Sequence, residues 1–299
     1  VPRPSKKEEK VIEFMRNFGE GLSLPTYVDA AGNVIVKKPA SKGMEDRKTV
    51  ILQSHLDMVH QKNAETDFDF LTQGIESYVD GDWVTAKGTT LGADNGMGVA
   101  TIMALLASDS ITHPPLEALF TIDEETGMTG AFELEKGILN GEILLNLDTE
   151  DDDEFSIGCA GGIDTNSIKN YSTCSIENGL AFEIIVKGLK GGHSGMDIHL
   201  ERGNANKLMN RVLQKGLNYG IRISEINGGS LRNAIPREST ACVVVDSEDF
   251  LTELDTLITQ IKSEYQVTEP NLSVEVTKKD FPLDTLSAEA SKEIIFSIS

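Results

Sequence analysis

Three short apolar segments of this sequence are each followed directly by acidic residues or a histidine. The residues that follow them are His55 and Asp57, Asp123 to Glu125, and Asp148. A further carboxylate, Asp94, lies in a glycine-rich turn before a helical segment, where backbone can approach a ligand closely; a simple helix cap is the alternative. Imidazole and carboxylate groups without cysteine form a ligand set that suits zinc, manganese or cobalt. These residues therefore predict a hydrolytic metal site.

Two close pairs of residues suggest a division of roles within this site. His55 and Asp57 are two positions apart on extended chain, so both side chains face the same side and Asp57 can hold the imidazole ring. Glu124 and Glu125 are neighbours and must point in different directions. One of them is therefore free to take a proton from water while the other binds metal.

The elements that must position these residues are predicted to form an α/β sheet. Apolar, β-branched runs at 49–53, 119–122 and 142–147 alternate with helical stretches such as Met97–Ala107, which favours buried strands. In such a sheet the functional crevice lies at the carboxyl ends of the strands, so residues far apart in sequence converge there. An amphipathic helix is predicted at Lys6–Phe18, where Gly19 and Gly21 would end it.

The pattern changes from about Leu180 onward. Strands are predicted at 181–186, 240–245 and 272–278, and helices at 204–215 and 250–265, the latter with Asp246 or Ser247 near its N-cap. This β-α-β-α-β order is typical of a small α+β domain. We therefore expect a catalytic metal-binding domain at residues 1–165 and a second domain at residues 166–299.

The composition of the chain excludes several kinds of partner. Its 48 acidic and 27 basic residues give a formal net charge of -21, which repels a phosphate backbone, so no nucleic-acid partner is expected. No segment offers the roughly 18 unbroken apolar residues of a membrane span. The 3 cysteines form no CxxC pattern, which favours a reducing cytoplasm over a disulfide framework. The acidic run at 151–154 is typical of a solvated turn.

Four motifs resemble those of a known group of enzymes. They are S-H-L-D at 54–57, G-A-D-N-G at 92–96, D-E-E-T-G at 123–127 and N-L-D-T-E at 146–150. They look like the metallopeptidases with two co-catalytic zinc ions that include aminoacylases, carboxypeptidases and di- and tripeptidases. The bacterial aminoacyl-histidine dipeptidases are most similar, because P-R-P-S at 2–5, G-G-H-S-G at 191–195 and N-A-I-P-R at 233–237 also match. The resemblance covers essentially the whole chain.

The resemblance implies roles for particular residues. The implied ligands of two divalent ions, zinc or else cobalt or manganese, are His55, Asp94, Glu125 and Asp148. Asp57 would orient the histidine, Glu124 would act as base and later as acid, and the Asp94–Asn95 peptide would be cis. The fold implied is a zinc-peptidase domain with a mixed sheet flanked by helices, plus a smaller α+β lid.

The lid would contribute to substrate binding and to assembly. The resemblance implies that His193 approaches the carbonyl or carboxylate of a short peptide substrate, often across a homodimer. A cap of the next helix is the alternative for this turn histidine, because glycines flank it. Asn233 is a candidate for binding substrate backbone. His60, His113 and His199 are interpreted as surface or packing residues.

A count of the implied ligands shows that one protein ligand is missing from the second metal. If Asp94 bridges two metals, with His55 and Asp148 on one and Glu125 on the other, the second metal has only two protein ligands. No remaining histidine follows a strand, so we place the missing ligand beyond residue 299. The resemblance implies that the closing part of the catalytic domain and the remainder of the lid follow there too. The sequence stops within the apolar run 294–299, which likewise leads us to expect a fragment.

The function expected is metal-dependent hydrolysis of dipeptides of the Xaa-His, β-alanyl-histidine type. Glu124 would activate a water that bridges the two ions. A tripeptidase or an N-acyl amino acid deacylase of the same clan is an alternative, since it would share every metal motif and differ in the lid. A non-catalytic metal-binding fragment is another.

Overall fold

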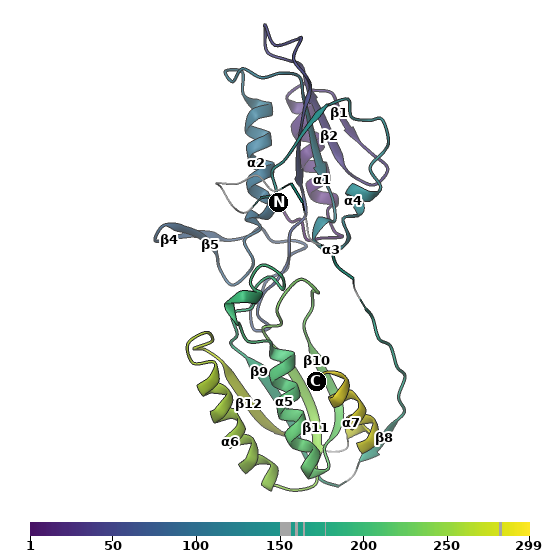
Figure 1. Ribbon diagram of the computed structural model, residues 1–299, viewed down its shortest axis with the longest axis vertical. Coiled ribbons are helices and arrows are strands. Elements are labelled where there is room, and N and C mark those ends of the chain that lie inside the picture. Colours follow the sequence, from purple (N-terminus) through teal and green to yellow (C-terminus); the bar gives the residue numbers. More distant parts are fainter. Residues whose placement is uncertain (150–156, 159–160, 164, 177, 281–282) are drawn as a thin grey trace. The chain divides into compact units, whose positions relative to one another are not determined.

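The chain folds into two compact units, Val1–Gly162 (unit 1) and Ile163–Ser299 (unit 2). The computed structural model describes residues 1–149, 157–158, 161–163, 165–176, 178–280 and 283–299 (Figure 1). Each unit has its own sheet and its own apolar core.

Unit 1 contains a five-stranded mixed sheet. Its strands, in spatial order, are β1 (Thr26–Val28), β2 (Val34–Lys38), β6 (Leu116–Thr121), β3 (Val50–His55) and β7 (Ile143–Asn146). β1, β2 and β6 pair antiparallel, whereas β6, β3 and β7 are parallel. The carboxyl ends of the three parallel strands therefore lie at one edge of the sheet.

Two helices, α1 (Glu9–Gly21) and α2 (Ala93–Ala107), pack against one face of this sheet (Figure 1). The core between them includes Met15, Ile102 and Phe120. The irregular segment 134–139 covers the other face through Ile35, Ile51 and Leu119. Shorter elements complete the unit: α3 (Glu124–Gly127), α4 (Thr129–Phe132) and the hairpin β4 (Ser77–Asp80) and β5 (Trp83–Ala86). The predicted mixed α/β fold is confirmed.

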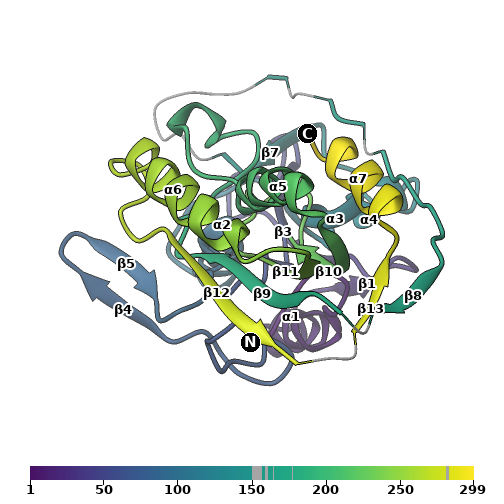
Figure 2. The same cartoon turned by 90° about the horizontal axis from the view of Figure 1, so that it is seen from below.

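Unit 2 is built on a four-stranded antiparallel sheet. Its strands, in spatial order, are β10 (Arg222–Gly228), β11 (Ser239–Val245), β9 (Leu180–Lys187) and β12 (Ser273–Lys279). Helices α5 (Ala205–Gly216) and α6 (Asp249–Glu264) cover one face of it (Figure 2). Smaller elements are β8 (Thr173–Ile176), β13 (Leu283–Leu286), α7 (Ala288–Ser297), and the 3-10 turns η1 (Ile198–Leu200) and η2 (Leu217–Tyr219). This is an α+β arrangement.

The structure differs from the sequence-based expectation at several points. The strand β10 was not predicted, so the order in unit 2 is not β-α-β-α-β. The helix α6 is preceded by Glu248 rather than by a side-chain cap, although the Ser247 hydroxyl accepts a hydrogen bond from Asp249 N at 3.2 Å. None of the helices in the described part of the chain is both long and apolar enough to cross a membrane.

The prediction that Gly19 ends the first helix was wrong, because α1 continues to Gly21. Gly19 is buried and faces β1 and β2, where an added Cβ would lie 2.3 Å from Thr26 Oγ1 and 3.0 Å from Val36 Cγ2. This glycine allows the helix to approach the sheet closely.

Replacing Gly19 with alanine is therefore expected to lower the free energy of unfolding by about 1–3 kcal/mol, as overpacked sites do. Gly21→Ala is the matched control, since an added Cβ there meets nothing within 4 Å. It should leave stability unchanged or raise it by up to about 1 kcal/mol. Urea denaturation of both variants measures the difference. Equal stability of the two would contradict the close packing at Gly19.

Candidate metal centre

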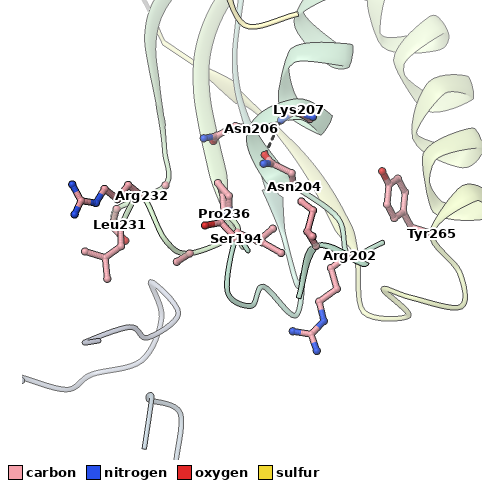
Figure 3. Close-up of a pocket in the computed structure, with 14 residues that line it drawn as sticks. Ser194, Arg202, Asn204, Asn206, Lys207, Leu231, Arg232, Pro236 and Tyr265 are labelled. Carbon is pink, nitrogen blue, oxygen red and sulfur yellow. Dashed lines mark hydrogen bonds between the residues drawn. The ribbon is translucent and has the colours of Figure 1, made fainter. Parts of the chain in front are cut away.

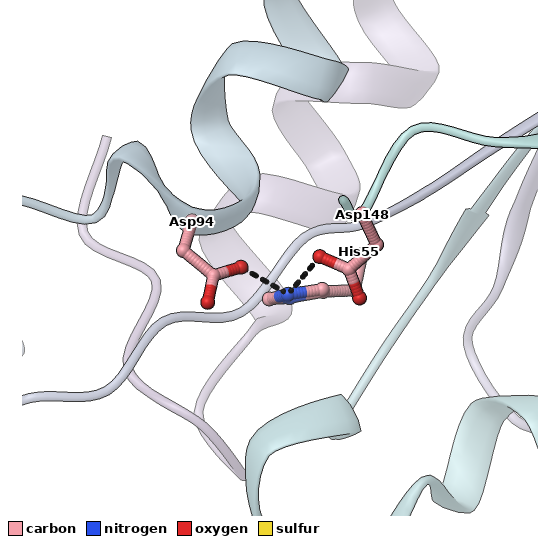
Figure 4. Close-up of side chains that lie close together, drawn as sticks. All are labelled: His55, Asp94 and Asp148. Carbon is pink, nitrogen blue, oxygen red and sulfur yellow. Dashed lines mark hydrogen bonds and ion pairs between the residues drawn. The ribbon is translucent and has the colours of Figure 1, made fainter. Parts of the chain in front are cut away.

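The imidazole of His55, the last residue of β3, lies among carboxylates at the carboxyl edge of the sheet (Figure 4). Its Nε2 is 3.0 Å from Asp94 Oδ1, 3.5 Å from Asp148 Oδ1 and 3.9 Å from Glu124 Oε2. The histidine is 1% exposed, whereas the Asp94 side chain is 58% exposed. The structure thus brings these predicted residues together, with the cluster open to solvent beside Asp94.

The predicted residues form two groups of possible ligand atoms that share the histidine. One comprises His55, Asp94 and Asp148, and the other comprises His55, Glu124 and Glu125. Within each group the ligand atoms lie within 4.8 Å of one another. A buried third group in the described part of the chain, Glu8, Asp57 and Asp123, contains carboxylates only. Glu8 Oε1 accepts hydrogen bonds from Lys6 N and Asp123 N, which is a structural use.

Asp57 is fully buried and connects the end of β3 to the turn that carries both glutamates. Its carboxylate lies 3.3 Å from His55 Nδ1 and accepts hydrogen bonds from Glu124 N at 3.0 Å and Glu125 N at 3.3 Å. Burial raises the pKa of Asp57, but the hydrogen bonds from His55 and Glu124 outweigh it and the pKa is lowered. Since Nδ1 faces this anion and the Asp57 carbonyl, Nε2 is the nitrogen left for a ligand.

The first residues of α2 include Asp94 and a residue that was not predicted to contribute, Asn95. The Asp94–Asn95 peptide is cis, as the resemblance implies, and both residues depart from helical geometry inside α2. The buried Asn95 amide donates to Asp148 Oδ1 at 2.6 Å and accepts from Gly98 N at 3.1 Å. Asn95 therefore connects the start of α2 to the end of β7. The motif G-A-D-N-G includes this asparagine, which can both donate and accept, but the sequence does not reveal its partner at Asp148.

The electrostatics of the cluster favour a bound cation. Burial lowers the pKa of His55, but hydrogen bonds to the three surrounding aspartates raise it to about 12. Burial, followed by the charge of Asp94, raises the pKa of Glu125 to about 7. Burial also raises the pKa of Glu124, which the histidine opposes. The single imidazole thus faces more carboxylates than one positive charge would neutralise. With the ring neutral, this set of nitrogen and oxygen donors fits a divalent ion.

The two predicted substrate-binding residues lie beside each other in unit 2. His193 forms an isolated bridge with Ala234, and Ser194 N donates to the Asn233 carbonyl at 2.8 Å. The His193 Nδ1 atom accepts from Gly195 N at 3.1 Å and Met196 N at 3.0 Å. His193 therefore binds backbone amides of its own turn rather than capping the next helical element, η1, and its Nε2 is left as a donor.

A cavity of about 580 Å³ opens next to this bridge (Figure 3). Its lining includes Ser194, Arg202, Asn206, Arg232 and Pro236, and the two arginines extend from opposite sides of it. The cavity therefore combines cationic, polar and apolar groups within unit 2.

The other histidines have different surroundings. His60 packs edge-on against Phe70 with ring centroids 5.8 Å apart, His113 is buried with its Nδ1 2.8 Å from the Pro114 carbonyl, and His199 is exposed. Cys174 and Cys242 are free thiols. The acidic run 151–154 and Cys159 lie outside the described residues.

Comparisons with known proteins agree with the motifs. Residues 184–271 match the M20 peptidase dimerisation domain. The cytosol non-specific dipeptidase of Escherichia coli (strain K12) is 45% identical over 279 residues, which are 92% of this chain and 58% of that protein. The uncharacterized protein YqjE of Bacillus subtilis (strain 168) is 30% identical over 124 residues, which are 40% of this chain and 30% of that protein.

A solved structure is similar along the whole chain. The crystal structure of aminoacylhistidine dipeptidase from Vibrio alginolyticus is 44% identical with a TM-score of 0.53, and the match covers 100% of this chain and 62% of that one. The chain therefore spans less than two thirds of the length of this protein and of the Escherichia coli dipeptidase. Over its own length, this chain is similar to a bacterial aminoacylhistidine dipeptidase and to a cytosol non-specific dipeptidase, and its residues 184–271 match the dimerisation domain of peptidases.

Proposed function

We propose that this chain takes part in the metal-dependent hydrolysis of dipeptides, with Xaa-His dipeptides among its substrates. The observation that carries the proposal is the convergence of His55 Nε2 with Asp94, Asp148 and Glu124 at the carboxyl edge of the sheet. The names of the Escherichia coli and Vibrio alginolyticus relatives, a non-specific dipeptidase and an aminoacylhistidine dipeptidase, support this substrate class. Unit 1 would be the catalytic domain and unit 2 the lid.

The ligands proposed for the first ion are one of the groups around the histidine, and those for the second ion follow the ligand assignment that the resemblance implies. His55, Asp94 and Asp148 would hold one divalent ion, and Asp94 and Glu125 would hold a second, with zinc the first choice and cobalt or manganese the alternatives. When bound, the ions would supply Lewis-acid polarisation of the peptide carbonyl and a lower pKa for water. Asp57 would keep the imidazole in the required orientation and tautomer through Nδ1.

Glu124 would carry the proton during the reaction. Its backbone is held by the Asp57 carboxylate, while its side chain points toward the histidine. Burial raises the pKa of Glu124, so its carboxylate is a stronger base than one in water. It would accept a proton from the attacking water and return it to the leaving amine. His193 and Asn233 would bind the substrate from unit 2.

The proposed assembly is a cytoplasmic homodimer formed through unit 2. The match of residues 184–271 to a peptidase dimerisation domain supports it. Light scattering after size-exclusion chromatography should then give about twice the 32.5 kDa mass of the chain. A monomer at all accessible concentrations would contradict the dimer without bearing on the metal site.

The substrate class is tested by release of free amine from β-Ala-His, Gly-Gly-Gly and N-acetyl amino acids in the presence of Zn²⁺. Preferred cleavage of β-Ala-His supports the dipeptidase. Preferred cleavage of the tripeptide or of the acetylated compound would instead indicate a tripeptidase or a deacylase. Metal binding without any turnover would indicate a non-catalytic metal-binding chain.

Metal binding should stabilise the folded protein. Zn²⁺ at about 100 times its dissociation constant is expected to raise the free energy of unfolding by about 2.7 kcal/mol per site, because the ligands converge only in the folded state. Chelation should reverse the increase, as urea denaturation would measure. His55→Gln should lose this increase, whereas His199→Gln, at an exposed histidine in η1, should keep it. Equal losses in both variants would assign the binding to surface histidines.

A further inference from the structure

The segment at Arg3 to Ser5 lies against the end of β3 and has no role in the proposed chemistry. Pro4 and Met58 form a parallel bridge, in which Met58 N donates to the Arg3 carbonyl at 3.1 Å. Ser5 Oγ donates to Asp57 Oδ2 at 2.8 Å. These contacts fix the backbone around the Arg3 side chain.

The guanidinium of Arg3 joins two segments that carry proposed ligands. Nη1 donates to the carbonyl oxygens of Leu56 and Asp57, each at 2.9 Å, and Nη2 donates to the carbonyl oxygen of Gly92. The first two carbonyls directly follow the histidine of the cluster, and the third lies two residues before Asp94. One side chain therefore connects the end of β3 to the turn before α2.

Two glycines of that turn leave room for the guanidinium. An added Cβ would lie 2.7 Å from Arg3 Nη2 at Gly92 and 2.9 Å from it at Gly96. Gly92 also has a φ of 74°, which favours glycine, and its carbonyl accepts from Gly96 N at 3.2 Å. The turn that presents Asp94 is thus shaped around the arginine.

The geometry of arginine suits this contact. A guanidinium is a rigid planar fork with several donors, whereas a lysine ammonium is a single compact charge. Burial lowers the pKa of Arg3, while the charges of Asp57, Asp94 and Glu125 oppose this. The side chain remains cationic, since arginine does not lose its proton in proteins.

We propose that Arg3 is a positioning residue that fixes the Asp94 turn relative to His55 and so sets the geometry of the metal centre. This inference rests on the proposed metal binding, because loss of Arg3 would change the affinity of the metal centre for its ion. These three hydrogen bonds from Arg3 all end on backbone carbonyl oxygens, so its removal leaves every proposed ligand in the chain. Loss of an outer partner of this kind is expected to weaken metal binding by about 10- to 100-fold.

The test compares Arg3→Met and Arg3→Lys with the control Arg16→Met. Arg16 lies on α1, where it approaches the exposed Glu13 and Glu20 at 3.9 and 4.0 Å, so its replacement removes the same charge at a site away from the turn. Two quantities are measured: Zn²⁺ affinity by calorimetry, and amide hydrogen exchange at 92–98 in the metal-free protein. Both Arg3 variants should bind Zn²⁺ about 10- to 100-fold more weakly and exchange faster in this segment. Arg16→Met should match the wild type.

Wild-type affinity and exchange in either Arg3 variant would overturn the inference, because the turn would then be held without the guanidinium. If the wild type binds no Zn²⁺, the proposed function fails, and amide exchange alone decides whether Arg3 fixes the turn. If Arg3→Met does not fold, Gly96→Ala crowds the guanidinium while keeping Arg3, and it should show the same two changes. Gly74→Ala, where an added Cβ meets nothing within 4 Å, is its control.

Discussion

Replacing Asp94 with asparagine is expected to weaken Zn²⁺ binding by at least about 100-fold, since removal of an outer partner alone costs 10- to 100-fold. Asp94 Oδ1 lies 3.0 Å from His55 Nε2, and its carboxylate is the proposed ligand common to both ions. The amide keeps the size of the side chain but loses the negative charge that a divalent ion requires. Calorimetric titration of the metal-free protein with Zn²⁺ measures the loss.

Asp109→Asn serves as the control for this prediction. Asp109 is exposed and follows α2, so the substitution removes an equal charge at the other end of the same helix. Its Zn²⁺ affinity should stay at the wild-type value. Similar losses in the two variants would mean that overall negative charge, rather than this cluster, attracts the ion.

Replacement by glutamine should have different effects at Glu124 and Glu125: the first should lower kcat, and the second should weaken Zn²⁺ binding. Glu124→Gln is expected to lower kcat by about 10²- to 10⁴-fold, the range for loss of a general base, while Zn²⁺ affinity stays within a few-fold of the wild type. Glu125→Gln should instead weaken Zn²⁺ binding, because Glu125 is a proposed ligand. Amine release from β-Ala-His and Zn²⁺ calorimetry, measured on both variants, distinguish the two roles.

The outcome that would contradict this division is a loss of Zn²⁺ binding in Glu124→Gln with none in Glu125→Gln. The roles would then be exchanged. The backbone amides of both glutamates share one acceptor, Asp57, so both substitutions keep these two hydrogen bonds. A change in circular dichroism should therefore not accompany either loss.

Much of the candidate site was predictable because its histidine and acidic residues lie at or just after the ends of strands that the sequence predicts. β3 ends at His55, and the sequence places Asp57, Glu124 and Asp148 just beyond the ends of β3, β6 and β7, so a parallel sheet is enough to bring these residues together. The contributions of Arg3 and Asn95 were not predictable from pattern. Their roles depend on hydrogen bonds to residues distant in sequence, which no periodicity encodes.

The missed strand β10 has a local explanation. Its pairing with β11 shifts register between Ile223 and Glu225, so its apolar residues, Ile223 and Ile226, do not follow the alternation expected of a strand. The helix end at Gly19 was mispredicted because a contact with residues distant in sequence overrides the local preference of glycine. Glycine usually ends a helix, but here packing against Thr26 and Val36 favours its place inside one.

The parallel ladder of β3, β6 and β7 has a consequence for the heat of metal binding. The ladder holds these strands in register, Gln53 pairing with Leu119 and with Asn146, before any ion arrives. Metal binding would then order little additional chain and bury little apolar surface, unlike in small zinc domains that fold on binding. Its heat-capacity change should accordingly be close to zero, so that the enthalpy measured at 10 °C and at 35 °C would be nearly the same.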